Sequence, residues 1–147
     1  MRLSTKGRYG ARLMLELSLY YGQGPVLLKD IAERQGISEK YLGHLIPPLK
    51  AVGLIFSIRG AHGGYNLAKP PQEITLAEVL QAVEGGLVLV ECVTSPAVCN
   101  RVESCVTRDI WGLISKKMKE ELSSITLQDM VKRHKQKQNL QPLTYNI

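Results

Sequence analysis

The thiol groups are the side chains of this sequence with the greatest potential for chemistry. The chain has only three cysteines, Cys92, Cys99 and Cys105, and they lie within fourteen residues that lack a sustained apolar period. Three thiols cannot all pair in disulfides within one chain, whereas three soft thiolates leave a fourth position for another ligand, as in many zinc and iron–sulfur sites. The spacing predicts a metal-binding or cluster-binding loop, with separate free thiols as the alternative.

The remaining side chains do not suggest catalysis. His44, His62 and His134 are scattered, without acidic or nucleophilic partners nearby in the sequence, so we do not expect an enzyme. The chain has no apolar run of signal-peptide length at its start and no run of about 18 apolar residues. We therefore expect a cytoplasmic protein without membrane contact, where clustered cysteines favour a metal or redox role over a structural disulfide.

Positive charge is concentrated in the first half of the chain. The 147 residues carry a formal net charge of +6, and residues 1–70 hold 10 Lys and Arg against 4 Asp and Glu, whereas residues 71–147 hold 9 against 9. The first half could therefore neutralise a phosphate backbone. A solvated basic surface is the alternative on charge alone.

Residues 28–46 have the pattern of a helix-turn-helix. Leu28–Gln35 has helical spacing, and Gly36 can adopt the positive φ that ends a helix. Ser38 can then cap a second helix from Glu39 to about Ile46. Two helices of an ordinary bundle would give a similar pattern, so the following segment is needed to narrow the interpretation.

The next segment predicts a β-hairpin wing. Residues 53–59 and 65–68 have strand character, with a glycine-rich loop between them. Arg59, at the end of the first strand, and His62, in the loop, lie at the tip of the hairpin. Glycines let the backbone approach a polyanion while a long cationic side chain enters a minor groove. A plain tight hairpin is the alternative.

The first helix, expected from about Ser4 to Tyr21, carries cations at its start. Lys6, Arg8 and Arg12 oppose the helix macrodipole there, which indicates an external anion such as a phosphate. Tolerated surface charge is the alternative.

The C-terminal half predicts a dimerisation helix. Thr75–Glu78 is a capping-box sequence for a short helix to Glu84, and Thr126–Asp129 caps one further short helix. Between them lies an apolar stripe that favours pairing with a symmetry mate, with packing onto its own domain as the alternative. The stripe comprises Val106, Ile110, Leu113, Ile114, Met118 and Leu122.

The predicted fold is mainly α with a small β-hairpin wing. We expect a winged helix-turn-helix DNA-binding domain over residues 1–84, a cysteine ligand loop over 85–104, a dimerisation helix with a short following helix over 105–131, and a flexible tail over 132–147.

Several motifs together resemble the bacterial winged-helix regulators related to IscR. The matching stretches include Arg2-Leu-Ser-Thr-Lys-Gly-Arg, Ile31-Ala-Glu-Arg-Gln-Gly-Ile-Ser and Gly53-Leu-Ile-Phe-Ser-Ile-Arg-Gly. The resemblance runs to about residue 130. It implies a dimeric transcription repressor that controls iron–sulfur cluster assembly genes. It also implies that the three cysteines bind an iron–sulfur cluster of the 2Fe-2S type and that Arg59 is the wing arginine.

The sequence departs from this family at the fourth cluster ligand. The family has a histidine three residues after the last cysteine, but this chain has Arg108, whose guanidinium stays protonated and cannot bind iron. Asp109 is the first candidate, because it lies four residues after Cys105 on the same face of the expected helix. Glu103, a residue of the partner chain and solvent remain alternatives.

Two further departures lie in the second helix of the helix-turn-helix. Gly43-His44 stands where the family has a Glu-Gln pair that contacts bases, so base preference is expected to differ. Pro47-Pro48 should break or kink the helix near Ile46, because neither proline supplies an amide hydrogen.

A double-stranded DNA operator is therefore the expected partner, bound by a homodimer. A DNA-binding thiol or zinc switch for sulfur or redox genes is the alternative, and a small electron-transfer protein is disfavoured by the helix-turn-helix and basic wing. The expected DNA contacts are Arg2, Ser4, Lys6, Arg8, Lys29, Ser38, Lys40, Tyr41, His44, Arg59 and His62.

Overall fold

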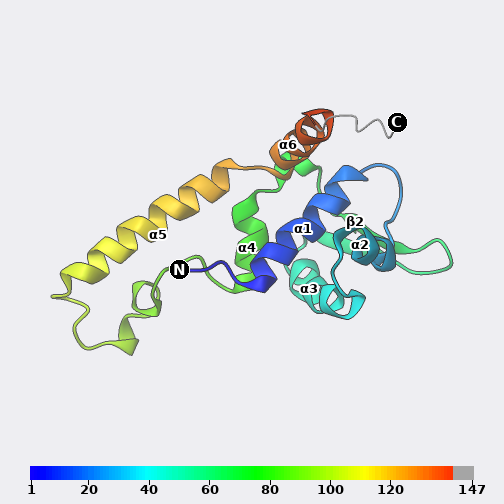
Figure 1. Cartoon of the computed structure of the whole chain (residues 1–147). Helices are drawn as coiled ribbons and strands as arrows, with labels where there is room; N and C mark the ends of the chain where they lie inside the picture. The colour runs from blue at the N-terminus through cyan, green and yellow to red at the C-terminus, as the bar shows by residue number, and fades with distance from the viewer. Residues whose placement is uncertain (141–147) are drawn as a thin grey trace.

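The computed structural model describes residues 1–140, and it confirms a mainly α fold with one β-hairpin. Residues 141–147 of the expected tail lie outside the described residues. None of the described helices is long and apolar enough to cross a membrane. The elements, in chain order, are α1 (Thr5–Leu19), α2 (Leu28–Gln35), α3 (Glu39–Ala51), β1 (Ile55–Ile58), β2 (Gly64–Leu67), the 3-10 turn η1 (Pro71–Glu73), α4 (Leu76–Glu84), the 3-10 turns η2 (Glu91–Val93) and η3 (Pro96–Val98), α5 (Val106–Ser124) and α6 (Leu127–Leu140) (Figure 1).

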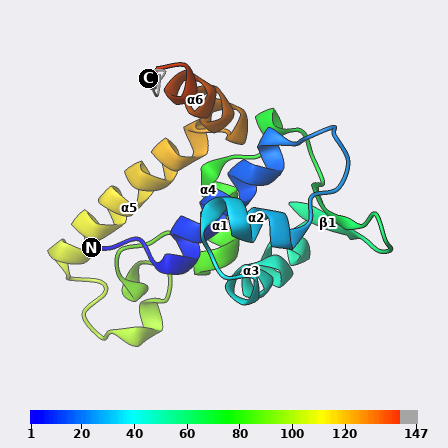
Figure 2. The same cartoon turned by 45° about the vertical axis from the view of Figure 1, so that its right-hand side comes forward.

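Helix α1 lies at the centre of the core. Its Leu13 and Met14 are fully buried, and they belong to the same apolar cluster as Ile31 of α2, Leu42 of α3 and Leu127 of α6. Burying a side chain of this size contributes about 1.5–3 kcal/mol. The shared cluster holds both helices of the helix-turn-helix in fixed positions against α1 (Figure 2).

The helix-turn-helix is formed by the glycine and the serine cap that its sequence predicted. Gly36 ends α2 with a φ of 62°, and Ser38 Oγ accepts a hydrogen bond from the Tyr41 amide at 3.0 Å. Ile37, between them, is buried and anchors the turn in the core.

Helix α3 does not end near Ile46 as predicted. It continues through Pro47 and Pro48 to Ala51. Each proline costs about 3 kcal/mol inside a helix, but this helix buries four large apolar side chains at about 1.5–3 kcal/mol each. Tertiary packing therefore outweighs the missing hydrogen bonds. These buried residues are Leu42, Leu45, Ile46 and Leu49.

The hairpin projects from the end of the molecule opposite to the start of α5 (Figure 1). Its register runs from Ile55 opposite Leu67 to Ile58 opposite Gly64. Gly64 has a φ of 150°, and a Cβ atom there would lie 2.5 Å from the Val26 carbonyl oxygen. Only glycine fits where β2 runs beside Val26, so this residue fixes how the hairpin leaves the body.

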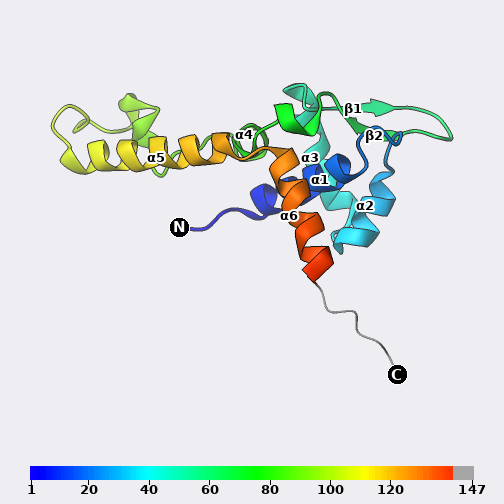
Figure 3. The same ribbon diagram turned by 90° about the horizontal axis from the view of Figure 1, so that it is seen from above.

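A short β-bridge joins the start of α4 to the start of α6. Thr75 and Thr126 pair, and the flanking backbone bonds run from the Leu76 amide to the Ile125 carbonyl at 2.8 Å and from the Leu127 amide to the Ile74 carbonyl at 2.9 Å. Thr75 caps α4 and Thr126 caps α6, as predicted. From this joint α5 extends away from the helix-turn-helix (Figure 3).

Helix α6 is longer than the short helix predicted to end near residue 131. It continues to Leu140, so the expected flexible tail is helical over residues 132–140. Leu127 and Val131 are buried, which anchors the first two turns, and Lys and Gln are good helix formers beyond them.

The apolar stripe of α5 faces two different environments. Leu122 is half-buried against the small cluster of Ala77, Leu80 and Leu87, so this end packs onto its own chain. The end nearer the cysteines is exposed: Val106 is 71%, Ile110 46%, Leu113 52% and Ile114 41% accessible.

Candidate metal centre and nucleic-acid interface

The cysteines lie at the opposite end of the molecule from the hairpin (Figures 1 and 3). Cys92 is in the η2 turn, Cys99 directly follows η3, and Cys105 is the residue before α5. The segment before the loop is attached to the middle of α5 by the Leu89 amide, which donates to the buried Ser115 hydroxyl at 3.0 Å. The cysteine loop is therefore positioned by α5 rather than by the wing that precedes it in the sequence.

All three thiols are free, but they differ in environment. Cys99 is exposed, whereas Cys92 and Cys105 are half-buried. Cys105 Sγ lies 3.2 Å from the Thr107 hydroxyl. That hydrogen bond, together with the backbone amides of Arg108 and Thr107 at the start of α5, lowers the pKa of the Cys105 thiol. The thiolate is the form that binds a metal or attacks an oxidant.

The donor types fit a soft metal, but the described loop does not bring them to one point. Within residues 1–140, no three or more His, Cys, Asp and Glu side chains are grouped closely enough to hold a metal ion. The three thiols have the required softness and access to solvent. Ligation by all three would require a change in the loop that brings the three thiols together.

Arg108 stands at the position expected for the fourth ligand, and its guanidinium cannot coordinate iron. Arg108 Nε donates to the Cys92 carbonyl oxygen at 3.0 Å. The next residue, Asp109, is exposed in the first turn of α5, and its negative charge opposes the lowering of the Cys105 pKa. A carboxylate is therefore close enough to Cys105 to act on it electrostatically.

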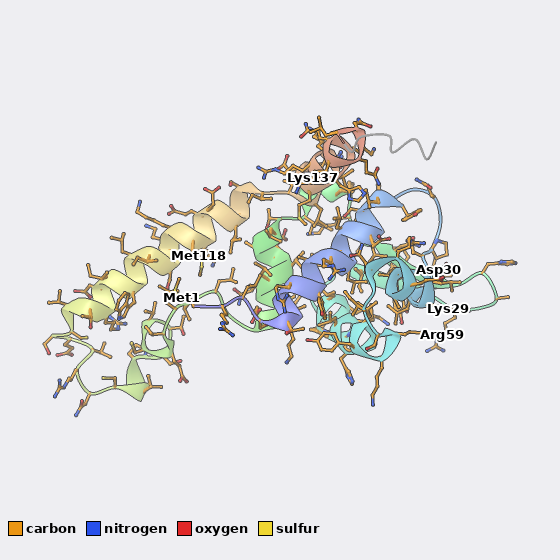
Figure 4. All side chains as sticks on the ribbon, in the orientation of Figure 1. Met1, Lys29, Asp30, Arg59, Met118 and Lys137 are labelled. Carbon is orange, nitrogen blue, oxygen red and sulfur yellow. The ribbon has the colours of Figure 1, made fainter. Side chains whose placement is uncertain are left out.

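Most of the predicted DNA contacts are exposed. Figure 4 places Lys29 and Arg59 at the hairpin end of the molecule, away from Met118 on α5. The charged residues in this group belong to the start of the chain and of α1, the helix-turn-helix and the hairpin. The exposed members are Arg2, Lys6, Arg8, Lys29, Ser38, Lys40, His44, Arg59 and His62.

Two predicted contacts, Ser4 and Tyr41, are half-buried and have structural partners. Ser4 Oγ accepts from the Gly7 amide at 3.1 Å and donates to Glu84, so it caps α1 and ties it to the end of α4. The Tyr41 ring packs edge-on against Tyr9, with centroids 5.4 Å apart. These contacts tie α1 to the end of α4 and to α3.

Sequence reasoning missed a polar network that fixes the first two helices. Glu16 is buried, and it accepts from Arg34 Nε and from the Gln35 side-chain amide, each at 2.8 Å. Arg12 donates to the Gln35 side-chain oxygen at 2.8 Å and to the Gln35 carbonyl. Arg12 therefore caps the end of α2, which gives this cation an internal acceptor.

No pattern in the sequence marks this network. Glu16 lies among apolar residues of α1, and its partners are 18 and 19 residues away in the chain. Arg34 also stacks over Tyr20, with its guanidinium carbon 4.6 Å from the ring centroid. The network sets the angle between α1 and α2, and thus the placement of the helix that follows.

Comparison with known proteins gives a consistent family. A family model described as Rrf2, an iron-dependent transcriptional regulator, matches residues 3–133. The chain is similar to the protein rrf2 of Nitratidesulfovibrio vulgaris, with 43% identity over 132 residues, covering 90% of this chain and 88% of that protein. It is also similar to the transcriptional regulator CymR of Bacillus subtilis, with 42% identity over 130 residues, covering 88% and 89%.

Two solved structures are similar to this chain in both fold and sequence. The structure of T. potens IscR has a TM-score of 0.77 and 40% identity, covering 94% of this chain and 91% of that one. The structure of CymR, described as the global cysteine regulator of B. subtilis, has a TM-score of 0.74 and 39% identity, covering 90% and 98%. The family model and B. subtilis CymR are described as transcriptional regulators, in agreement with the expectation that the chain is not an enzyme.

Proposed function

Because the chain belongs to the Rrf2 family of transcriptional regulators, we propose that it is a homodimeric DNA-binding regulator that senses iron–sulfur cluster status. Cys92, Cys99 and Cys105 would hold the cluster, of the 2Fe-2S type, and its presence would control repression of cluster assembly genes. The observation that carries this proposal is the confinement of all three cysteines, as free thiols, to one loop at the start of α5.

The chain's own residues account for how such a site would work. When bound, a cluster supplies a cross-link between loop residues that is sensitive to iron supply and to oxidants. Cys105 directly precedes α5, and its lowered pKa favours the thiolate form that a metal binds. Cys92 lies in the η2 turn and Cys99 directly follows η3, so the three thiols would have to converge to share one cluster.

A symmetric dimer is supported by the exposed end of the α5 stripe. Four large apolar side chains at positions 106, 110, 113 and 114 follow three- and four-residue steps along one face and are between 41% and 71% accessible. A second copy of the same helix is the partner whose stripe matches in length and spacing. Two copies would place two helix-turn-helix units on a partly palindromic operator.

The direct test is the spectrum of anaerobically purified protein, together with its iron, sulfide and zinc content. Visible absorption with equal amounts of iron and sulfide would support the cluster, and bound zinc without iron would contradict it. Operator affinity measured with and without the cluster then tests whether the cluster controls DNA binding.

A thiol switch is the second candidate, favoured by the lowered pKa of Cys105 and the exposure of Cys99. Two thiols would give two electrons and two protons to a peroxide, forming a disulfide and water. One related structure is described as an oxidized form of Staphylococcus aureus CymR. Iron-free protein whose operator affinity changes reversibly with peroxide and dithiothreitol would favour this function over the cluster.

Asp109 is the proposed fourth ligand of the cluster. We expect Asp109→Ala to leave an open or water-bound iron and a cluster that decays faster in air, and Asp109→Cys to hold the cluster at least as firmly as the parent. Visible absorption followed over time measures both. Unchanged spectra and decay rates in both variants would point instead to Glu103 or to the partner chain.

Arg59 is proposed to contact the minor groove from the hairpin. We expect Arg59→Ala to weaken specific operator binding by about 1–3 kcal/mol without changing the dimer or the cluster, because Arg59 is exposed at the end opposite to both. Arg101→Ala is the matched control, since it removes the same charge from the exposed cysteine loop. Equal loss of affinity in both variants would show that net charge, rather than the wing contact, is responsible.

A further inference from the structure

Arg108 connects two parts of the cysteine loop that are distant in the sequence. It lies in the first turn of α5, and its Nε donates to the carbonyl oxygen of Cys92, 16 residues earlier, at 3.0 Å. Arg108 is half-buried, although a guanidinium at a helix start could extend into solvent. The bond to Cys92 therefore fixes the first cysteine relative to the helix that begins directly after the third.

The packing around this bond supports the same arrangement. Val93, next to Cys92, lies close to Gly112, where a Cβ atom would be 4.0 Å from the valine side chain. Positions 108 and 112 are one helical turn apart, so they present one face of α5 to the η2 turn. This face is distinct from the exposed apolar stripe, and it leaves the stripe free.

We propose that Arg108 is a positioning residue, which holds the Cys92 turn against the start of α5 and so sets the separation of the first and third thiols. This role deepens the proposed function and rests on it where the cluster is concerned. Arginine suits the position because its planar guanidinium, on a long side chain, can reach and donate to a backbone carbonyl. Position 108 would thus act on the site through Cys92 without itself being a ligand.

The first experiment measures the position of Cys92 without any cluster. In full-length protein carrying Cys99→Ser and Cys105→Ser, the rate of Cys92 alkylation by N-ethylmaleimide reports how firmly the turn is held. Losing one hydrogen bond of about 1 kcal/mol corresponds to about 5-fold, so Arg108→Met should speed alkylation by about that factor. Arg108→Lys keeps a cationic donor and should remain nearer the parent.

Arg101→Met is the control for this series. Arg101 is exposed on the same loop, and its replacement removes the same charge without breaking the bond to Cys92, so its alkylation rate should equal the parent's. Circular dichroism shows whether each variant is folded. If Arg108→Met does not fold, Arg108→Gln takes its place, since its shorter side chain should still release the turn. An alkylation rate equal to the parent's in the folded variant overturns the proposal.

The second experiment measures the cluster-loaded protein. Removing a residue that orients a metal ligand typically costs about 10-fold or more in affinity, so the visible absorption of Arg108→Met should decay in air about 10-fold faster than the parent's, with partial recovery in Arg108→Lys. A parent protein without iron would overturn the proposed cluster function, while the alkylation series would still decide the role of Arg108. A parent with a cluster and an equally stable Arg108→Met cluster would overturn the role of Arg108 alone.

Discussion

Cys92→Ala, Cys99→Ala and Cys105→Ala are each expected to abolish the visible absorption of anaerobically purified protein and to reduce its iron and sulfide content to background. Three thiolates supply most of the donors of the proposed site, and alanine supplies none. The fold should survive, because none of the three cysteines lies in the buried core. Absorption spectra, iron and sulfide assays and thermal unfolding of each variant measure these outcomes.

Ser95→Ala is the matched control for the cysteine variants. Ser95 lies in the same loop between Cys92 and Cys99, so its replacement tests whether any change in the loop disturbs the site. We expect it to keep the parent's spectrum. A variant lacking all three cysteines that retained its full iron and sulfide would refute the assignment of the loop as the cluster site.

The double variant Ile110→Asp/Ile114→Asp is expected to be monomeric and to lose high-affinity operator binding. Each substitution would place an unpaired carboxylate in the proposed α5 interface, at a cost of about 3 kcal/mol or more. Two such costs, about 6 kcal/mol together, raise the dissociation constant of the dimer by about 20,000-fold. A monomer then contacts only one half-site. Sedimentation velocity and operator titration measure the two effects.

Lys116→Gln/Lys119→Gln changes the net charge of α5 by the same amount and is the control for that variant. Both lysines are exposed and lie outside the apolar stripe, so the control should remain dimeric. If the aspartate variant sediments like the parent, the stripe is not the dimer interface. If the parent itself is monomeric, the dimer model is wrong.

The local signals in the sequence were sufficient for most helix boundaries. Ser38, Gly36 and the Thr75–Glu78 capping box each satisfy backbone groups with their own side chain or conformation, so a few neighbouring residues determine the outcome. The end of α3 was different. Pro47 and Pro48 carry a local stop signal, but the buried side chains around them come from contacts with distant segments, which no local pattern reveals.

The candidate site was predictable in its donors but not in its arrangement. The clustering of the cysteines is visible in the sequence, and so is the lack of a histidine at position 108. The bond from Arg108 to the Cys92 carbonyl and the buried Glu16 network depend on how helices pack. In chain order the cysteine loop comes after the wing and α4, whereas the fold places the loop and the wing at opposite ends of the molecule (Figure 1).

The bridge between Thr75 and Thr126 connects the end of α5 to the rest of the fold. The helix has 19 residues, so it is about 28 Å long, and it meets the DNA-binding part of the chain at this bridge. A tilt of α5 by about 2° about this bridge moves the cysteine end of the helix by about 1 Å. In the proposed homodimer, an ångström-scale movement of the cysteine loop would correspond to a small rotation at the bridge in each chain. It would therefore change the spacing and tilt of the two helix-turn-helix units relative to each other.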